Sequence, residues 1–433
     1  MWRRGACPGL SAPMPTGDGL LARLLPVGTI PLKDFTGLCA AAREHGNSVI
    51  EVTARGSLQV RGLTQASAPR FAAAVAALNI AAQDGIPVLC NPLAGLDPDE
   101  IVDAAALGVD LRRALSRTPL AVRPAPKVSI AIDGGGAFGL DELSADVRLC
   151  AEMVEGCSVL RIALGGDGVS ATPLGTIVPT DCTEAALGLL EIIARRGLSA
   201  RARDVLAAKG IEPFRESVSK LLLTSARPCE SGDPELDSRL RGNERKMAIG
   251  LHSLRDGSYA RGIGLAFGHA DALVLEQLAE TARAVGAVGI RAAPGRALLV
   301  IGLSDKTASA FADAAARLGF IVRADDPRRR VVACAGAPIC ASAYIAARAI
   351  APRIAEVAAP HLSDLLTIHI SGCAKGCAHP RPAALTIVGI ADGCALVANG
   401  TAREVPFALV AADDLFGATE RHLRERNREG VHA

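Results

Sequence analysis

The sequence predicts an α+β fold built from two related halves, and three observations support this prediction. The first is self-similarity at a shift of 240 residues, which sets Leu25 on Leu265, Gly28 on Gly268 and Ile50 on Ile290. The second is the pattern within each copy, where a helical apolar period lies between short segments with strand character. The third is composition, since 50% of the 433 residues are hydrophobic and 21% are charged, as in folded chains with a sizeable core.

Each copy of the repeat reads as a strand, a glycine turn, an amphipathic helix, a second glycine and two short strands. The helices are expected over Leu32–His45 and Ala272–Val285. The same shift places Val128–Asp133 on Ile368–Cys373, so the similarity continues downstream. The duplication therefore predicts a small and a larger α+β unit in each half.

The domain boundaries follow from the repeat and from a polar stretch between the halves. Residues 224–245 are rich in turn formers and charges and have no apolar period, which is typical of a linker. We expect small units over 1–86 and 246–325, and larger units over 87–223 and 326–433.

Charge and hydropathy argue against several classes of partner. Lys and Arg number 47 and Asp and Glu number 45, a net charge of +2, which gives no reason to expect nucleic acid or an anionic membrane. No apolar run approaches the roughly 20 residues of a membrane span. The first residues lack the apolar stretch of a secretory signal. We therefore expect a soluble cytoplasmic protein.

Four of the twelve cysteines form two close pairs in the second half of the chain. Cys334 and Cys340 have the spacing C-x5-C, and Cys373 and Cys377 have the spacing C-x3-C, both among Gly, Ala and Pro. Clustered cysteines in a reducing compartment indicate metal ligands or catalytic groups. Because a cubane [4Fe–4S] cluster takes four thiolates, these four residues are its predicted ligands.

Two other interpretations of these cysteines were open. Structural zinc also takes four thiolates, but its knuckles favour C-x2-C to C-x4-C spacing, narrower than the first pair. Four unrelated buried cysteines would not explain two close pairs. In the repeat alignment Asp133 stands at the place of Cys373 and Ala137 at the place of Cys377, so we expect the first half to lack a cluster. The eight scattered cysteines are expected to be small buried hydrophobic residues.

The loop Gly134–Gly139 matches G-x-G-x-x-G after a predicted strand, a pattern also found in dinucleotide-binding folds. No helical period follows, since Leu140–Leu143 reads as another turn. The repeat accounts for the loop as the counterpart of a cysteine loop. We therefore expect no nicotinamide or flavin site, and NADH-derived electrons would arrive through a separate reductase.

Together these residues resemble the sulfite/nitrite reductase hemoprotein superfamily. The matching segments are Gly17–Leu20 and Thr53–Gly62 in the first small unit, Ala293–Leu298 in the second, and Ser371–Pro380 at the cysteine loop. The resemblance implies a duplicated nitrite/sulfite reductase-like architecture. Each half then pairs a ferredoxin-like half-domain with a larger cluster- or siroheme-type unit, of which 326–433 is the [4Fe–4S]-binding domain.

Within the superfamily, three segments are most similar to the precorrin-3B synthases: RGACPGL (4–10), CAGAPICASA (334–343) and ISGCAKGCAHP (370–380). This resemblance implies an NADH-linked monooxygenase of aerobic cobalamin biosynthesis. It would hydroxylate the tetrapyrrole precorrin-3A at C20 with O2 and close a γ-lactone. The implied cofactors are the [4Fe–4S] cluster and a second mononuclear iron or siroheme, and an electron-donor protein is the implied partner.

The anion site of the reductases is only partly present. Arg55 and Lys127 match two of its cations, whereas Ser129 and Ile86 stand where two others are expected. Because each charge-assisted contact contributes about 1.5–3 kcal/mol, their loss weakens binding of a small oxyanion. A siroheme-dependent sulfite or nitrite reductase is therefore the alternative function. An iron–sulfur electron-transfer or scaffold protein is the alternative from another class.

A precorrin is edged with acetate and propionate carboxylates, which the planar fork of arginine meets in bidentate fashion. Corresponding strand regions of the two repeats supply four arginines, and the match to the reductases supplies a lysine. We expect these residues to bind the tetrapyrrole carboxylates: Arg55, Arg61, Lys127, Arg291 and Arg296. No acid or base residue stands out as catalytic.

Overall fold

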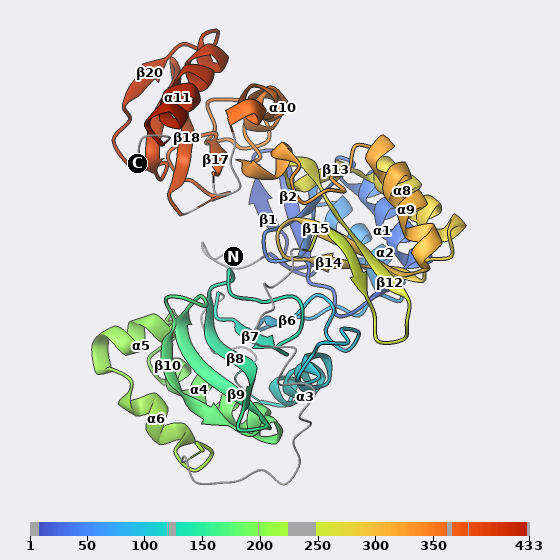
Figure 1. The fold of residues 1–433 in the computed structure, drawn as a ribbon, viewed down its shortest axis with the longest axis vertical. Helices are drawn as coiled ribbons and strands as arrows, with labels where there is room; N and C mark the ends of the chain where they lie inside the picture. The colour runs from blue at the N-terminus through green and yellow to red at the C-terminus, as the bar shows by residue number, and fades with distance from the viewer. Residues whose placement is uncertain are drawn as a thin grey trace.

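The computed structural model describes residues 8–118, 120, 127–197, 199–223, 248–361, 366–379 and 381–430. The predicted linker, 224–245, and most of the RGACPGL segment lie outside these ranges. Figure 1 shows two larger domains, one light blue to green (β6 to α6) and one orange to red (β16 to α11), beside a body formed by the two small units in blue and in yellow to light orange.

Two five-stranded antiparallel sheets form the central body, and their strand orders correspond. The first sheet has the order β1 (Met14–Thr16), β2 (Gly19–Leu24), β5 (Leu58–Leu63), β4 (Val49–Val52), β13 (His269–Asp271). The second has the order β11 (Gly250–Ser253), β12 (Tyr259–Gly264), β15 (Ala297–Leu303), β14 (Gly289–Ala293), β3 (Ile30–Pro31).

Each of these sheets takes its last strand from the other half of the chain. His269 of β13 pairs with Glu51 of β4, and Ile30 of β3 pairs with Ile290 of β14. The two exchanges are related by the shift of the sequence repeat, so the body has an internal pseudo-two-fold axis. Because ladder hydrogen bonds cross between the halves, neither half completes its sheet alone.

Helices pack against one face of both sheets and form a common core with them. The predicted helices are confirmed as α1 (Leu32–His45) and α8 (Ala272–Ala284), the second ending one residue early. Both bury apolar residues at the i, i+3, i+4 and i+7 positions of one face, namely Phe35, Leu38, Cys39 and Ala42 in α1 and Leu275, Leu278, Ala279 and Ala282 in α8. α1 packs on α8, while α2 (Ser67–Ala76) and α9 (Asp305–Arg317) flank them.

The two larger domains also share one strand plan, three parallel strands followed by two antiparallel ones. The first contains β6 (Val88–Cys90), β7 (Ile130–Asp133), β8 (Ala145–Val154), β9 (Cys157–Gly166) and β10 (Thr172–Ile177). The second contains β16 (Val331–Ala333), β17 (Ile368–Ser371), β18 (Ala383–Ile390), β19 (Gly393–Gly400) and β20 (Ala408–Val410). Their helices are α3 (Ala104–Ser116), α4 (Cys182–Arg195), α5 (Ala202–Lys209) and α6 (Glu212–Val218) in the first, and α10 (Ala347–Ala358) and α11 (Leu415–Gly430) in the second.

Strand register corrects the sequence alignment of the loops after β7 and β17. These two strands hold the same place in their sheets and pair with β8 and β18 in the same way. Asp133 ends β7 as Ser371 ends β17, so these two residues correspond. The predictions that Asp133 stands at the place of Cys373 and Ala137 at that of Cys377 are wrong, because segments between the strands differ in length and one shift cannot serve every element.

Other local predictions can be checked directly. Residues 134–144 are all described and none is helical, so the glycine-rich loop runs from β7 into β8 without the helix of a dinucleotide fold. Of the scattered cysteines, Cys157 is disulfide-bonded, which corrects the expectation for that residue. Within the described ranges, no helix has both the length and the apolar content needed to cross a membrane.

The shared core of the two small units gives a stability prediction. Phe35 is fully buried in a cluster with residues from both units, so Phe35→Ala should lower the free energy of unfolding by about 3–5 kcal/mol. Urea unfolding followed by circular dichroism measures this. Phe407→Ala is the matched control, since Phe407 is 51% exposed. Equal losses from the two substitutions would contradict a single core spanning both units.

Candidate metal centre

The four paired cysteines lie in two loops at one edge of the second larger domain. Cys334 directly follows β16 and Cys373 lies just beyond β17, while Cys340 and Cys377 lie farther along the same loops. The strand before Cys373 is β17, and all four of its residues are buried. Because β16 and β17 are adjacent and parallel, their carboxyl ends bring the two loops together.

Hydrogen bonds join the two cysteine loops. The Gly372 N–H donates to Cys334 Sγ at 3.0 Å, and the Tyr344 N–H donates to the Gly372 carbonyl at 2.8 Å. Lys375 Nζ donates to Ser342 Oγ at 2.7 Å. A backbone N–H aimed at a thiol sulfur stabilises the thiolate form, which is the form that binds metal.

The four thiols also influence one another electrostatically. Burial raises the pKa of Cys334, and the nearby thiols of Cys340 and Cys373 raise it further. Burial likewise raises the pKa of Cys377, again with contributions from Cys373 and Cys340. Cys334 and Cys377 therefore both lie close to Cys340 and Cys373, and a coordinated metal would favour the thiolate forms of this group.

The residues around the loops fit a compact inorganic group. Gly372 leaves no room for a side chain, because an added Cβ would lie 2.6 Å from the Ala343 Cβ. An added Cβ at Gly336 would lie 2.3 Å from the Ala347 nitrogen. Within the described chain, no three His, Cys, Asp or Glu side chains converge on one ion. In a cubane each thiolate binds its own iron corner, so its ligands do not have to converge in that way.

His369 supplies a second sign of fit. This β17 residue is fully buried, and neither ring nitrogen has a hydrogen-bond partner. It lies beneath the loop, 3.8 Å from where a Gly376 Cβ would be, and its ring centroid is 5.8 Å from that of His379. Burial, followed by His379 and Arg296, lowers its pKa to about 4. A buried imidazole whose ring nitrogens have no partner is consistent with a further group, held by the Cys373–Cys377 loop, that would accept its N–H.

The first ferredoxin-like unit covers the Cys340 loop. Gly17, at the turn between β1 and β2, lies so close that an added Cβ would be 2.4 Å from the Ala341 nitrogen. The neighbouring Asp18 accepts hydrogen bonds from Arg61 Nη2 at 3.0 Å and from Asn47 Nδ2 at 3.0 Å. Arg61 therefore holds the turn that closes over this loop.

Arg61 is also part of a buried ion network between domains. Its Nε lies 3.5 Å from Glu51 Oε1, and Glu51 in turn accepts from Arg348 Nη2 at 2.5 Å. Arg348 belongs to α10, so the network ties the first small unit to the second larger domain. The Arg61 guanidinium thus faces Asp18 and Glu51, and it lines neither the pocket at Arg291 nor the pocket at His252.

The other predicted cations are not gathered at one place. The hairpin tips that carry Arg55 and Arg296 touch, with the Gly295 N–H donating to the Ala54 carbonyl at 3.1 Å. From there Arg55 donates to the Ser144 carbonyl in the first larger domain. Arg296 donates at 3.1 Å to the carbonyl of Ala378, next to Cys377. The two guanidinium groups therefore serve opposite larger domains.

Arg291 and Lys127 lie elsewhere. Arg291 donates to Thr29 Oγ1 at 2.7 Å and to the carbonyls of Pro92 and Ala94 at 3.2 and 3.0 Å. It lines one pocket together with Arg55. Lys127 is exposed. That pocket also contains Arg112 of α3, which the sequence analysis missed because it considered arginines of the repeated strand regions and not of the helices.

The first larger domain has the same two loops without the cysteines. Residues 91–103 separate β6 from α3, and the equally long segment 334–346 separates β16 from α10. Asn91 and Asp97 therefore take the positions of the first two cysteines. Asp97 Oδ2 accepts the Ala137 N–H at 2.7 Å, so this carboxylate binds the second loop directly.

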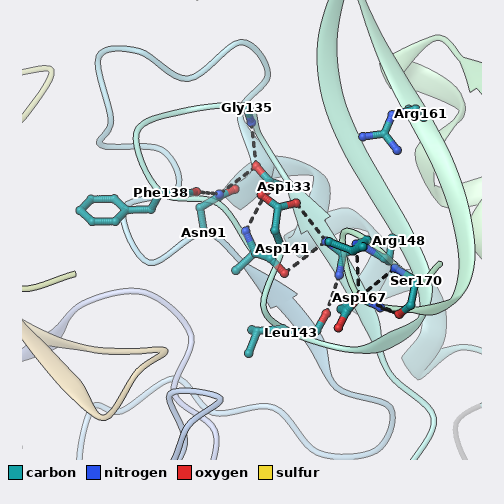
Figure 2. Close-up of polar contacts among 12 residues, drawn as sticks. Asn91, Asp133, Gly135, Phe138, Asp141, Leu143, Arg148, Arg161, Asp167 and Ser170 are labelled. Carbon is teal, nitrogen blue, oxygen red and sulfur yellow. Dashed lines mark hydrogen bonds and ion pairs between the residues drawn. The ribbon is translucent and has the colours of Figure 1, made fainter. Parts of the chain in front are cut away.

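Asn91 makes three hydrogen bonds to the end of β7 and the loop that follows it. Its Oδ1 accepts the Gly134 N–H at 2.6 Å, in the place where Cys334 accepts a glycine N–H in the other half. Its Nδ2 donates to Asp133 Oδ1 at 3.0 Å and to the Phe138 carbonyl. Figure 2 shows the contacts of Asn91 with Asp133 and Phe138. In the first larger domain, the Asn91 amide and the Asp97 carboxylate thus join the two loops whose counterparts in the second larger domain carry the thiols.

Comparisons with known proteins agree with this architecture. Residues 12–78 match the nitrite/sulfite reductase ferredoxin-like half domain. A precorrin-3B synthase from a Sinorhizobium species is 39% identical over 422 residues, covering 97% of this chain and 88% of the relative. A ferredoxin–nitrite reductase from Synechococcus elongatus is 26% identical over 401 residues, covering 86% and 77%. The solved structure of the Mycobacterium tuberculosis NirA protein superposes with a TM-score of 0.75 at 19% identity, covering 94% of this chain and 81% of that one, and shares the fold.

The Asn91 network gives a prediction for the first half. Asn91→Ala should leave the buried Gly134 N–H without an acceptor, which costs about 1–3 kcal/mol of unfolding free energy. Urea unfolding at neutral pH measures the loss. Asn79→Ala is the control, because Asn79 is exposed. An Asn91 variant as stable as the control would show that these hydrogen bonds do not hold the loops together.

Proposed function

The chain belongs to the precorrin-3B synthase family, and we propose that it is the oxidoreductase that hydroxylates precorrin-3A at C20 with O2 and closes the γ-lactone of precorrin-3B. The observation that carries this proposal is similarity to a precorrin-3B synthase along nearly the whole chain. The two contacting cysteine loops support it with a donor set suited to redox chemistry. The sulfite/nitrite reductase alternative rests on the more distant similarity.

Cys334, Cys340, Cys373 and Cys377 would hold a [4Fe–4S] cluster, which when bound supplies the one-electron transfers that closed-shell side chains cannot. The chain orients these ligands. Gly372 donates to Cys334 Sγ, and Arg296 fixes the carbonyl next to Cys377. The Gly17 turn packs on the Cys340 loop and holds it in place.

Further parts of the proposal concern the partners of this centre. A second iron, mononuclear or in siroheme, would accompany the cluster. Electrons derived from NADH would come from a separate donor protein. Arg55, Lys127, Arg291 and Arg296 would bind carboxylates at the tetrapyrrole edge, where arginine offers bidentate contacts. Arg61 would act indirectly, since Asp18 and Glu51 occupy its guanidinium.

The reaction is tested with anaerobically purified protein, a chemical reductant and precorrin-3A under 18O2. The expected product is heavier than the substrate by one oxygen atom derived from O2, as measured by mass spectrometry. Assays with sulfite and nitrite in the same reductant run in parallel. Reduction of either anion without hydroxylation of the tetrapyrrole would favour the reductase instead.

The ligand assignment gives its own prediction. Cys373→Ser should lose most of the bound iron and acid-labile sulfide, and with it the visible charge-transfer absorption and the activity. Cys394→Ser is the matched control, because Cys394 is a free cysteine, 1% exposed, in the same sheet but away from both loops. A Cys373 variant with full iron content would remove this residue from the ligand set.

A further inference from the structure

The two larger domains meet the central body through related contacts that carry different charges. On the second domain, Glu51 of β4 pairs with Arg348, the second residue of α10. The pseudo-two-fold axis places Arg291 of β14 at the position of Glu51, since Ile290 corresponds to Ile50 in the exchanged strands. Ala105, the second residue of α3, stands at the position of Arg348.

The first half therefore has an arginine and an alanine where the second half has an ion pair. Loss of the long Arg348 side chain at Ala105 leaves space, and replacement of Glu51 by Arg291 leaves an extra positive charge. A pocket of about 260 Å³ lies at this position, lined by both Ala105 and Arg291. It is the space that the second half fills with its salt bridge.

The pocket concentrates positive charge among apolar walls. Arg55, Arg112 and Arg291 line it, together with side chains such as Leu25, Val88, Val109 and Leu143. None of its lining residues, all within the described ranges, is Asp or Glu. Three guanidinium groups without a lining carboxylate favour an anionic ligand with an apolar stem.

Arg291 and Arg112 donate hydrogen bonds to neutral groups. Arg291 donates to a hydroxyl and two carbonyls, and burial lowers its pKa to about 10. Arg112 donates to the Val88 carbonyl at 3.4 Å. Glu100 acts on Arg291 electrostatically, but its carboxylate is occupied by the N–H groups of Gly95 and Ala104. A ligand carboxylate would therefore complete the charge balance that Glu51 provides in the other half.

We propose that the pocket between β6, α3 and the tips of the small units binds an alkyl carboxylate. Arg291 and Arg112 would hold it at the position that corresponds to the Glu51–Arg348 pair of the other half. The volume of the pocket lies below the roughly 300–1,000 Å³ of ordinary ligand sites, so it takes a small organic acid or one acid arm of a larger molecule. If the carboxylate is one arm of a larger molecule, that molecule would be the tetrapyrrole with its acetate and propionate arms, and this part of the inference rests on the proposed function.

The test uses the full chain and two probes measured by isothermal titration calorimetry. Glutarate represents a free organic acid, and uroporphyrin represents a tetrapyrrole with acetate and propionate arms. Ala105→Glu places a carboxylate opposite Arg291 and should weaken binding of the occupying probe at least tenfold. Arg112→Gln should weaken it in the same direction. Arg113→Gln is the matched control, since Arg113 is on the same helix but 60% exposed.

Each outcome decides the proposal. If the Ala105→Glu and Arg112→Gln variants lose binding of glutarate alone, the pocket is a site for a free organic acid. If they lose binding of uroporphyrin, the pocket is a site for a tetrapyrrole arm. The proposal is overturned if neither probe binds the wild-type chain, or if Ala105→Glu and Arg112→Gln bind both probes as the Arg113 control does. Because binding is measured without turnover, a wild-type chain that fails to hydroxylate precorrin-3A would count against the proposed function and not against the pocket.

Discussion

The exchange of one strand between the two small sheets is the constraint on which the rest of the structure depends. The backbone groups of β4 and β14 are paired by β13 and β3, each of which comes from the other half of the chain. This exchange fixes the pseudo-two-fold axis. It also brings the hairpin tips of Arg55 and Arg296 into contact, so that one guanidinium reaches each larger domain.

A symmetric backbone carries asymmetric chemistry. The loops after the first two parallel strands are related in the two larger domains, and in each a side chain accepts a glycine N–H across the loops. In one half that acceptor is a thiol, and in the other it is the amide of Asn91. Buried polar groups must be paired, so the half without thiols closes its loops with Asn91 and Asp97. The half with thiols leaves His369 unpaired beside them.

The same asymmetry separates the charges around the body. Glu51 and Asp18 neutralise Arg61 at the contact with the second larger domain, which makes that contact part of the scaffold. At the related contact with the first larger domain, Arg291 stands at the position of Glu51 and Ala105 at that of Arg348, and the pocket between them has no lining Asp or Glu. At the contact with the second larger domain, the buried charges therefore hold a loop in place. At the contact with the first larger domain, Arg291 and Arg112 would bind the proposed ligand.

The sequence by itself determined the duplication, the helices α1 and α8 and the two cysteine pairs. The duplication follows from the 240-residue shift, and the helices and cysteine pairs follow from local spacing, as in the i, i+3 and i+4 positions of Phe35, Leu38 and Cys39. Only the tertiary structure decided which loop residues correspond, because Asp133 is matched to Ser371 by strand register and not by a constant shift. It also decided which arginines share a site. Arg291 and Arg112 lie far apart in the chain, and they line one pocket because the first larger domain packs on the exchanged sheets. No sequence pattern predicts that packing.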